Sequence, residues 1–484
     1  MTPVPTPGPT GALEPTDPGE PTDPGETPAE HRREQHSWYW YDWANSAYIT
    51  TTLTVLLSPY LTTLAKRAAC PGQDTGQTCR TALRVLGIPI APGSLALYTI
   101  TAATFLSAVL LPVVGAAVDR TGNKRTLLAR IAWTGALAAS AMVFLGGTRW
   151  WLGVILTLIA NLAMGCSLVI YDAILVDIST PDERDSVSSR GWAFGYVGGG
   201  ILLALNLAVV SAHDAIGLSS EAAVRVSLLS AGLWWGGFTI IPFRGLKDRP
   251  PLTPANDPAN SPSNGPAADP AHNAFSQLWH TLRDLPSYPQ TLLFLLAYLF
   301  YNDGIQTVIY ASSVFGQEEL HLGTGALITT ILVVQFVGFF GALVFGRLAA
   351  RIGARRTVLL SLVLWCLVVG TGYFLPEHRA GLFILLGAFI GLVLGGSQAL
   401  SRSLFSQLLP RGREAEYFSL YQATERGTSW FGTLMFGLVY QLTGSYRSAI
   451  IALVVFFLVG GTLLGCVRLR KGIQDAGNPL PEIL

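Results

Sequence analysis

Apolar residues recur in long runs from residue 38 onward, and polar segments separate one run from the next. Most runs have about the 20 residues that an α-helix needs to cross the ~30 Å hydrocarbon layer of a bilayer. Because lipid offers the backbone no hydrogen-bond partners, each run is expected to be helical. The pattern predicts twelve membrane-spanning helices, at residues 38–64, 94–118, 126–147, 150–176, 190–211, 223–243, 290–313, 324–349, 356–375, 380–402, 415–440 and 447–467.

Two connections between these runs are long, at residues 65–93 and 244–289, and the second is rich in proline, asparagine and alanine. The second connection divides the runs into six and six. We therefore expect an all-α membrane protein with two pseudo-symmetric six-helix bundles, at residues 38–243 and 290–467. Residues 244–289 would form a cytoplasmic linker, and residues 468–484 would form a cytoplasmic C-terminal tail.

The first 37 residues differ in composition from the rest of the chain. The stretch from Glu14 to Pro28 repeats proline, glycine and acidic residues and contains no apolar residue, so it has too little apolar surface to fold. We expect residues 1–37 to be a disordered cytoplasmic tail.

Composition supports the membrane class, because half of the 484 residues are hydrophobic and only 13% are charged. Most lysine and arginine residues lie in segments on the same side as the N-terminus, which predicts that both termini are cytoplasmic. The preference for arginine over lysine favours a bacterial plasma (cell) membrane. Cys70 and Cys79 share the first external connection, where they would either form a disulfide or remain free thiols.

Several function classes find no support in the sequence. The net charge of +1 predicts no nucleic-acid partner. The sequence contains no nucleotide-binding loop, metal-ligand cluster or nucleophile–base set. We therefore expect no metal, no cofactor and no enzymatic activity.

A short motif occurs in both halves of the chain. The segment GAAVDRTGNKRT, after the second run, matches GRLAARIGARRT, after the eighth run. The matched positions are Gly115 with Gly346, Arg120 with Arg351, Gly122 with Gly353, and Lys124–Arg125 with Arg355–Arg356. The first copy resembles the signature loop of the major facilitator superfamily. In that family the glycine allows close helix packing, and the aspartate and basic residues form a charge network that holds the cytoplasmic side shut. The resemblance implies this gate role for Gly115, Asp119, Arg120, Gly122, Lys124, Arg125 and, in the second copy, Arg351.

Five further segments resemble the autophagy-related vacuolar effluxer-like family and its bacterial relatives. They are YDWANSAY (41–48), RGWAFGYVGGG (190–200), AYLFYNDGIQT (297–307), GGSQALSRSLFSQLLP (395–410) and AEYFSLYQATER (415–426). The resemblance covers residues 38–467 and implies a twelve-helix facilitator fold. In the fungal branch it suggests export of amino acids from the vacuole. One departure is Arg426, where the family often carries lysine.

Ionisable side chains inside the apolar runs are costly in lipid, so they are expected to face the bundle interior or a water-filled path. Asp42, Asn45 and Ser46 lie on one face of the first helix. They would either line the transport path or form a hydrogen-bond network at the cytoplasmic edge.

The seventh run carries Asp303 close to the expected bilayer midplane, where it would either carry a proton or connect two helices. Additional hydrogen-bonding groups come from its neighbours Tyr301, Asn302 and Gln306.

In the eleventh run, Glu425 and Arg426 point in different directions, so each needs a partner on another helix. Arg426 would either bind a substrate carboxylate or form a structural ion pair. Gln398 is a candidate for the cavity wall. The residues near the inner ends of their runs that we assign to the cytoplasmic gate are Asp172, Arg190 and Arg402.

These features favour a secondary active transporter that works by alternating access between the two sides of the bilayer. The carboxylates favour proton coupling, and the family resemblance favours efflux of amino acids or similar small zwitterions. The expected partners are the lipid bilayer, a small-molecule substrate and protons, and the expected state is a monomer. The alternatives are an exporter of drugs or other metabolites, and a non-transporting sensor or assembly protein on the same scaffold.

Overall fold

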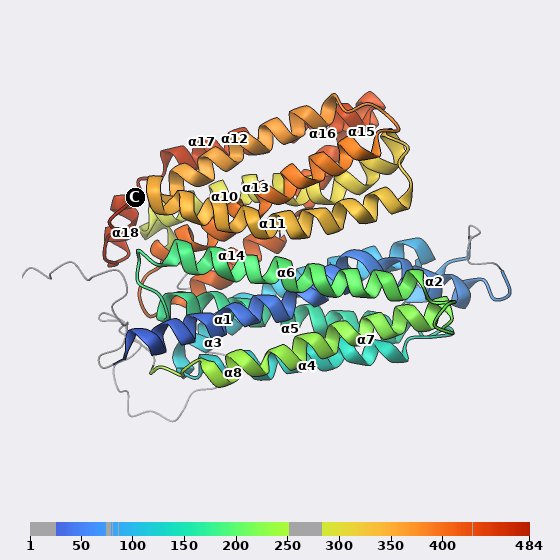
Figure 1. Ribbon diagram of the computed structural model, residues 1–484, viewed down its shortest axis with the longest axis horizontal. Helices are drawn as coiled ribbons and strands as arrows, with labels where there is room; N and C mark the ends of the chain where they lie inside the picture. Colours follow the sequence, from blue (N-terminus) through green and yellow to red (C-terminus); the bar gives the residue numbers. More distant parts are fainter. Residues whose placement is uncertain (1–25, 74–78, 80, 86, 251–282, 428) are drawn as a thin grey trace, which may run out of the picture.

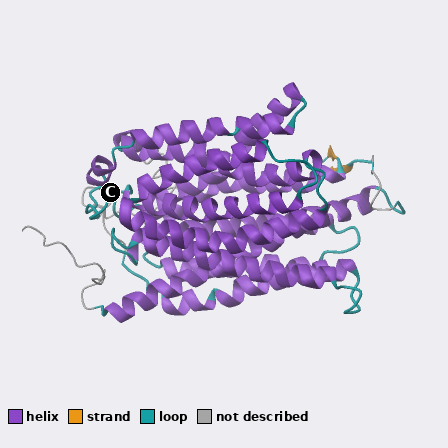
Figure 2. Ribbon diagram, turned by 45° about the horizontal axis from the view of Figure 1, so that its top comes forward, coloured by secondary structure: helices purple, strands orange, loops and turns teal. Residues whose placement is uncertain are grey.

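The computed structural model describes residues 26–73, 79, 81–85, 87–250, 283–427 and 429–484. Its long helices run roughly along one axis of the molecule (Figure 1). The start of α1 and the C-terminus lie at one end, which we name the terminal end. Figure 2 shows a short β-hairpin at the opposite end.

The first half of the chain begins at the terminal end and returns to it. Its hairpin pairs β1 (Leu83–Val85) with β2 (Ile88–Ile90) in antiparallel register. Its helices are α1 (Pro28–Ala47), η1 (Tyr48–Leu56), α2 (Leu57–Ala69), η2 (Pro92–Ser94), α3 (Leu95–Thr121), α4 (Lys124–Ala141), η3 (Met142–Phe144), α5 (Trp150–Asp177), α6 (Arg184–Ser211), α7 (Ser220–Phe238) and α8 (Ile240–Gly245).

The second half repeats this back-and-forth course. Its helices are η5 (Leu285–Ser287), α10 (Pro289–Val314), η6 (Phe315–Glu319), α11 (Thr324–Ile352), α12 (Ala354–Tyr373), α13 (Ala380–Gln407), α14 (Glu414–Gly427), α15 (Ser429–Thr443), α16 (Tyr446–Ala452), α17 (Val454–Cys466) and α18 (Leu469–Asp475).

Helices lie at every apolar run that the sequence predicts. Within the described residues, ten of them are long and apolar enough to cross a membrane. The first run, which forms α1, η1 and α2, and the eleventh, which forms α14 and α15, are not among these ten. Threonine and tyrosine lower the hydropathy of the first run, and the structure describes the eleventh as two segments of 14 and 15 residues.

Some helices extend beyond the apolar run at the terminal end. α6 begins at Arg184 and α13 ends at Gln407, several residues outside the predicted limits. The extra turns contact each other, because Arg184 donates from Nη1 to the carbonyl oxygen of Ser406 at 3.1 Å and Ser403 donates to Asp185. Contacts with another helix therefore stabilise turns that hydropathy alone does not predict.

The predicted boundary of the disordered tail at residue 37 is wrong, because residues 28–37 belong to α1. Thr27 and Glu30 form a capping box at the start of this helix, and the hydrogen bonds with Thr27 lower the pKa of Glu30. Glu34 is buried and pairs with Arg249 of the central connection at 2.8 Å. These local and distant contacts order a segment that has little apolar surface. The remainder of the predicted tail, residues 1–25, lies outside the described residues, as does most of the central linker.

The two halves pack against each other where α6 meets α11 and α13, and where α3 meets α14. Glycines permit this close approach. A Cβ atom on Gly115 of α3 would lie 2.9 Å from Cβ of Ser419 in α14. A Cβ atom on Gly346 of α11 would lie 2.6 Å from Oγ of Ser189 in α6. Both glycines lie toward the terminal end, so the halves are in close contact there.

Cys70 and Cys79 form a disulfide beside the β-hairpin. At the other end of the molecule, the predicted C-terminal tail contains α18, whose Ile473 is fully buried. Asn478 donates hydrogen bonds to the carbonyl oxygens of Gln407 and Leu409, which attaches the chain after α18 to the end of α13.

Candidate functional site

Arg402 of α13 has a buried guanidinium that lies between two buried carboxylates of the other half. Its Nη2 is 3.5 Å from Oδ2 of Asp42 in α1, and its Nη1 is 3.3 Å from Oδ1 of Asp172 in α5. We name these three residues the arginine cluster. Removing one partner from such a buried group leaves an uncompensated charge, so each residue depends on the others.

Ser188 and Gln422 complete the polar contacts of the arginine cluster. Arg402 donates from Nε to Oγ of Ser188 and from Nη2 to the Ser188 carbonyl oxygen, both at 3.0 Å. Gln422 of α14 donates from Nε2 to Oδ2 of Asp172 at 2.8 Å. The cluster therefore connects α1, α5 and α6 of the first half with α13 and α14 of the second.

Aromatic rings surround the same guanidinium. The Cζ atom of Arg402 lies 4.9, 5.3 and 5.6 Å from the ring centroids of Trp38, Tyr171 and Trp192. Trp38 stacks on Tyr171 with centroids 4.1 Å apart, and the Tyr171 hydroxyl donates to Oδ2 of Asp42 at 2.8 Å. Each desolvated cation–π contact contributes roughly 1–2 kcal/mol, so the rings reinforce the ion pairs.

A second polar group lies within the second half, where α10, α13 and α14 meet. The Tyr298 hydroxyl donates to Oε2 of Glu425 at 3.2 Å, and its ring stacks on Tyr421 at 4.2 Å. Gln398 donates from Nε2 to Oδ1 of Asn302 at 2.9 Å. Tyr298 and Asn302 are four residues apart and so share one face of α10.

Arg426 is half-buried next to this group. Its Nε is buried and has no hydrogen-bond partner among the described residues. Its Cζ would lie 3.7 Å from a Cβ atom on Gly165 of α5, so the side chain points toward the first half. A guanidinium with an unused donor between the halves is able to bind a carboxylate.

Asp303 of α10 is buried and accepts a hydrogen bond from the backbone N–H of Gly432 at 2.7 Å. Gly432 belongs to α15, so this hydrogen bond connects α10 with α15. Neither Oδ1 of Asp303 nor Oγ1 of Thr307, one turn later, has a hydrogen-bond partner among the described residues. Asp303 thus joins α10 to α15 through one carboxylate oxygen, and its other oxygen has no hydrogen-bond partner among the described residues.

At the terminal end, Asp119 of α3 caps α14. Its two carboxylate oxygens accept hydrogen bonds from the backbone N–H groups of Ala415 and Glu416, both at 2.9 Å. Gly115 lies one turn earlier on α3 and leaves room for the α14 backbone. The negative charge at the start of α14 also compensates the helix dipole.

Basic residues of the same motif bind acidic residues of α5 and of the central connection. Lys124 Nζ lies 3.0 Å from Oδ2 of Asp177. Arg125 donates to Asp248 twice, from its backbone N–H at 2.8 Å and from Nε at 3.2 Å. Gly122 ends α3 with a left-handed φ of 64°, a conformation that glycine adopts without steric strain.

Comparison with known proteins identifies the family of this chain. Residues 30–477 match the family described as "Vacuole effluxer Atg22 like". The protein belongs to this family. It is similar to the uncharacterized MFS-type transporter YxiO of Bacillus subtilis, with 29% identity over 93% of this chain and 98% of the relative. It is also similar to Autophagy-related protein 22-1 of Phaeosphaeria nodorum, with 26% identity over 93% of this chain and 92% of the relative.

The fold of this Atg22-like protein is also found among solved structures. The proton:xylose symporter XylE of the major facilitator superfamily (MFS) covers 93% of this chain with 98% of its own, with a TM-score of 0.67 and 11% identity. The family resemblance found in the sequence is therefore confirmed. The Atg22-like protein is a multi-pass membrane transporter with a major facilitator fold.

In this Atg22-like protein, the side chains of Asp42, Asn45 and Ser46, which the sequence placed on one helix face, make different contacts. Asp42 joins Asp172 and Arg402, which the sequence assigned to the gate, whereas for Asp42 it left open the transport path and a network at the cytoplasmic edge. Asn45 donates to the carbonyl oxygen of Tyr41, one turn earlier on its own helix. Ser46 packs against α6 at Gly195, where a Cβ atom would lie 2.7 Å from its Oγ.

The other predicted residues differ in how far their side chains are buried. The Tyr301 hydroxyl and Ser401 Oγ form a hydrogen bond of 2.7 Å, which connects α10 with α13. Gln306 is half-buried. Three of the predicted gate residues have exposed side chains: Arg120, Arg190 and Arg351.

Sequence reasoning missed the uncharged residues of both polar groups. Those that contact the candidates most closely are Trp38, Tyr171, Ser188, Tyr298 and Gln422. Weak signals existed for some of them. Tyr171 is next to Asp172 in the sequence, and Gln422 precedes Glu425 by three residues, which places both on the same face of α14.

Substitution of Asp119 by asparagine is expected to destabilise the contact between α3 and α14. The amide has a single acceptor oxygen, so one of two charge-assisted bonds to the α14 backbone is lost, which corresponds to about 1.5–3 kcal/mol. Unfolding of the purified protein by denaturant measures this change. Asp475→Asn, which removes an exposed carboxylate of α18, is the matched control. Equal stability of both variants would contradict the capping role.

Proposed function

We propose that this Atg22-like protein is a proton-coupled secondary transporter that exports amino acids or similar small zwitterions by alternating access. Its family consists of membrane transporters, which supports the general class. The observation that carries the finer proposal is the pair of neighbours Glu425 and Arg426, which presents both charges near residues of α5 and α10. A zwitterion carries the complementary pair of charges.

In this proposal the chain crosses the bilayer twelve times, in two bundles of six helices that move relative to each other. α1, η1 and α2 would form the first span as one continuous helical segment. α14 and α15 would form the eleventh span. Polar residues in these two spans, which lower their hydropathy, belong to the groups that contact the other half.

Binding of the substrate would use the free donor of Arg426 for the carboxylate and Glu425 for the ammonium group. Asn302, Gln398 and Tyr298 would contribute hydrogen bonds beside them, because they already form a connected group. Asp303 would carry the coupled proton on its unused oxygen. These roles rely on Arg426 pointing toward α5 of the first half and on the hydrogen bonds that the other residues form within the second half.

Alternating access requires a contact that opens and closes. The arginine cluster and the Asp119 cap both join the two halves near the terminal end. We assign these contacts to the cytoplasmic gate in its closed state, with Asp42 as an additional gate residue. The proposed topology has both termini in the cytoplasm and the protein in the plasma membrane, and the proposed unit is a monomer.

The direct test measures uptake of radiolabelled amino acids into proteoliposomes preloaded with the same compound. Arg426→Gln is expected to raise the KM about 10–100-fold, because a charge-assisted hydrogen bond to the carboxylate contributes about 1.5–3 kcal/mol. Arg426→Lys keeps the charge but loses the planar fork, so a smaller increase is expected. Exposed Arg347 of α11 provides the control variant Arg347→Gln.

Two outcomes would contradict this proposal. Unchanged transport by Arg426→Gln would favour an exporter of drugs or other metabolites that lack a carboxylate. Absence of exchange with every amino acid of a broad panel, by a correctly folded wild-type protein, would favour the non-transporting alternative.

A further inference from the structure

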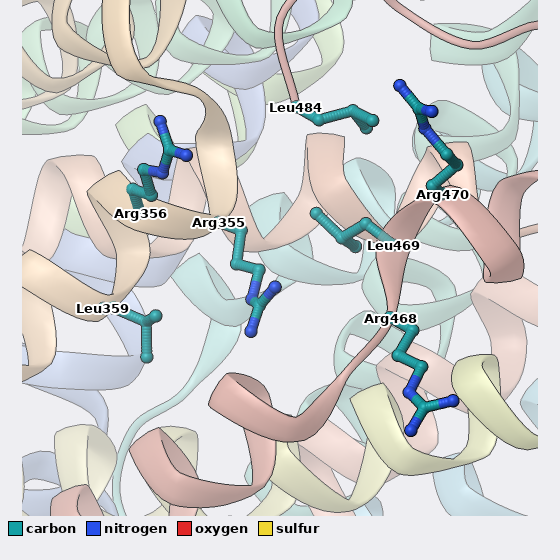
Figure 3. Close-up of a pocket in the computed structure, with 7 residues that line it drawn as sticks. All are labelled: Arg355, Arg356, Leu359, Arg468, Leu469, Arg470 and Leu484. Atoms are coloured by element: carbon teal, nitrogen blue, oxygen red, sulfur yellow. The ribbon is translucent and has the colours of Figure 1, made fainter.

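Four arginines surround a pocket at the terminal end of the second half. Arg355 and Arg356 belong to the first turn of α12, while Arg468 and Arg470 lie at the start of α18. The pocket has a volume of about 480 Å³ and is also lined by leucines. Figure 3 shows Leu469 and the C-terminal Leu484 between the arginine side chains.

The side chains that line this pocket carry four positive charges and no negative one, and the carboxylate of Leu484, which lies against Gly353, offsets one of the four. Arg355 donates from Nη2 to the carbonyl oxygen of Gly465, and its Nε is buried without a hydrogen-bond partner among the described residues. Like charges at close range repel each other, so an anion in this pocket would be stabilised by several guanidinium groups.

The internal repeat strengthens this argument. In the first half, Lys124 is neutralised by Asp177 at 3.0 Å. Arg355 stands at the matching position of the second copy, and α13, the equivalent of α5, ends at the uncharged Gln407 where α5 ends at Asp177. The second half therefore keeps the basic residue of the motif and lacks its acidic partner. An external anion would supply the missing negative charge.

The pocket lies at the ends of two apolar helices, which is the level of the lipid headgroups. Arg355 begins α12, and Arg468 closely follows α17, whose last residue is Cys466. Both helices belong to candidate membrane spans. Leu359 lines the pocket, and Val363 and Leu367 continue the same face of α12 with 57% and 59% exposure. An apolar stripe thus leads from the pocket along the outer surface of α12.

We infer that this pocket binds a phosphate ester, and that its source is the headgroup of an anionic phospholipid. The phosphate would lie among Arg356, Arg468 and Arg470, whose planar forks suit phosphate oxygens. One acyl chain would lie along the stripe formed by Leu359, Val363 and Leu367. Basic pockets next to membrane-spanning helices bind such headgroups through the same combination of charge and apolar surface. The site is separate from the proposed transport path.

The test is native mass spectrometry of the full-length protein in detergent with added phosphatidylglycerol or phosphatidylcholine. The wild-type protein is expected to bind phosphatidylglycerol preferentially. The double variant Arg468→Gln/Arg470→Gln is expected to weaken this binding about 30-fold, since each basic residue contributes about 1 kcal/mol. Arg356→Gln, on a different helix, is expected to weaken it less. Both variants remove exposed side chains, and their melting temperatures report whether the fold is retained.

Lys471→Gln is the matched control, because Lys471 is exposed on α18 next to the pocket but does not line it. Equal weakening by Lys471→Gln and by the double variant would overturn the site, since any nearby charge would then suffice. Equal binding of phosphatidylcholine and phosphatidylglycerol would also overturn it. Displacement of the lipid by millimolar inorganic phosphate would support the phosphate chemistry and assign it to a soluble source instead of the lipid.

Discussion

Substitution of Arg402 by glutamine is expected to destabilise the protein by about 3–5 kcal/mol and to abolish transport. The change leaves Asp42 and Asp172 buried without their shared cation, and that range is typical when one partner of a buried ion pair is removed. It also removes the bonds to Ser188 and the cation–π contacts. Denaturant-induced unfolding of the purified protein measures the first effect, and proteoliposome uptake measures the second.

The comparison with Arg184→Gln isolates the contribution of the two carboxylates. Arg184 is also buried between the halves, but its Nη1 donates to the neutral carbonyl oxygen of Ser406 and not to a carboxylate. Its loss is expected to destabilise the protein by only about 0.5–3 kcal/mol. A loss for Arg402→Gln no larger than for Arg184→Gln would contradict the central role of the arginine cluster.

A triple variant separates charge compensation from packing. Asp42→Asn/Asp172→Asn/Arg402→Gln removes all three charges and leaves side chains of similar volume. Because a buried ion group is often replaceable by neutral residues, this variant is expected to recover much of the stability that Arg402→Gln loses. It should still transport poorly, because a gate that opens and closes needs contacts of comparable stability in both states.

The helical segments could be predicted from hydropathy because lipid exposure imposes a direct requirement on each span. The prediction was poorer where polar contacts with other segments replace lipid. Residues 28–37 are helical because Thr27 caps them and Glu34 pairs with Arg249, a residue more than 200 positions away. No local sequence pattern predicts a partner so distant in the chain.

The sequence could predict which residues belong to the candidate site, but it could not predict which of them contact one another. Because a charged side chain in lipid has a high free-energy cost, the sequence alone identified Asp42, Asp172 and Arg402 as candidate functional residues. The contact between these three residues depends on how α13 packs against α1 and α5. These helices are far apart in the sequence. The sequence placed Asp42 with its neighbours Asn45 and Ser46 and placed Arg402 with the gate residues, whereas packing between the halves joins Asp42 and Arg402.

The polar groups of Asp119 and Asp303 have a common feature that the sequence did not suggest. Asp119 caps the start of α14, and Asp303 binds the backbone of α15 at Gly432, so both carboxylates hold segments of the same proposed eleventh span. Asp119 belongs to the first half and Asp303 to the second. The span is therefore held at its start by a residue across the contact and, further along, by a residue of its own half.

Replacement of Asp303 by asparagine is expected to abolish uptake driven by a proton gradient and to preserve exchange of labelled for unlabelled substrate. The amide oxygen of asparagine still accepts the hydrogen bond from Gly432, so the contact between α10 and α15 and the fold are retained. The amide cannot take up the coupled proton. Since exchange requires no net proton movement, only the gradient-driven reaction depends on a titrating group at this position.

Asp303→Ala provides the structural comparison, because it removes the hydrogen bond to Gly432 as well as the proton site. It is expected to lose about 0.5–1.5 kcal/mol of stability relative to Asp303→Asn, the range for one hydrogen bond. Proteoliposomes with an imposed pH difference, and the same vesicles without one, measure the two transport modes. Gradient-driven accumulation by Asp303→Asn at the wild-type level would exclude Asp303 as the proton carrier, since the variant has no ionisable group there. Loss of both modes with retained stability would instead assign Asp303 to substrate binding or to the movement of α15.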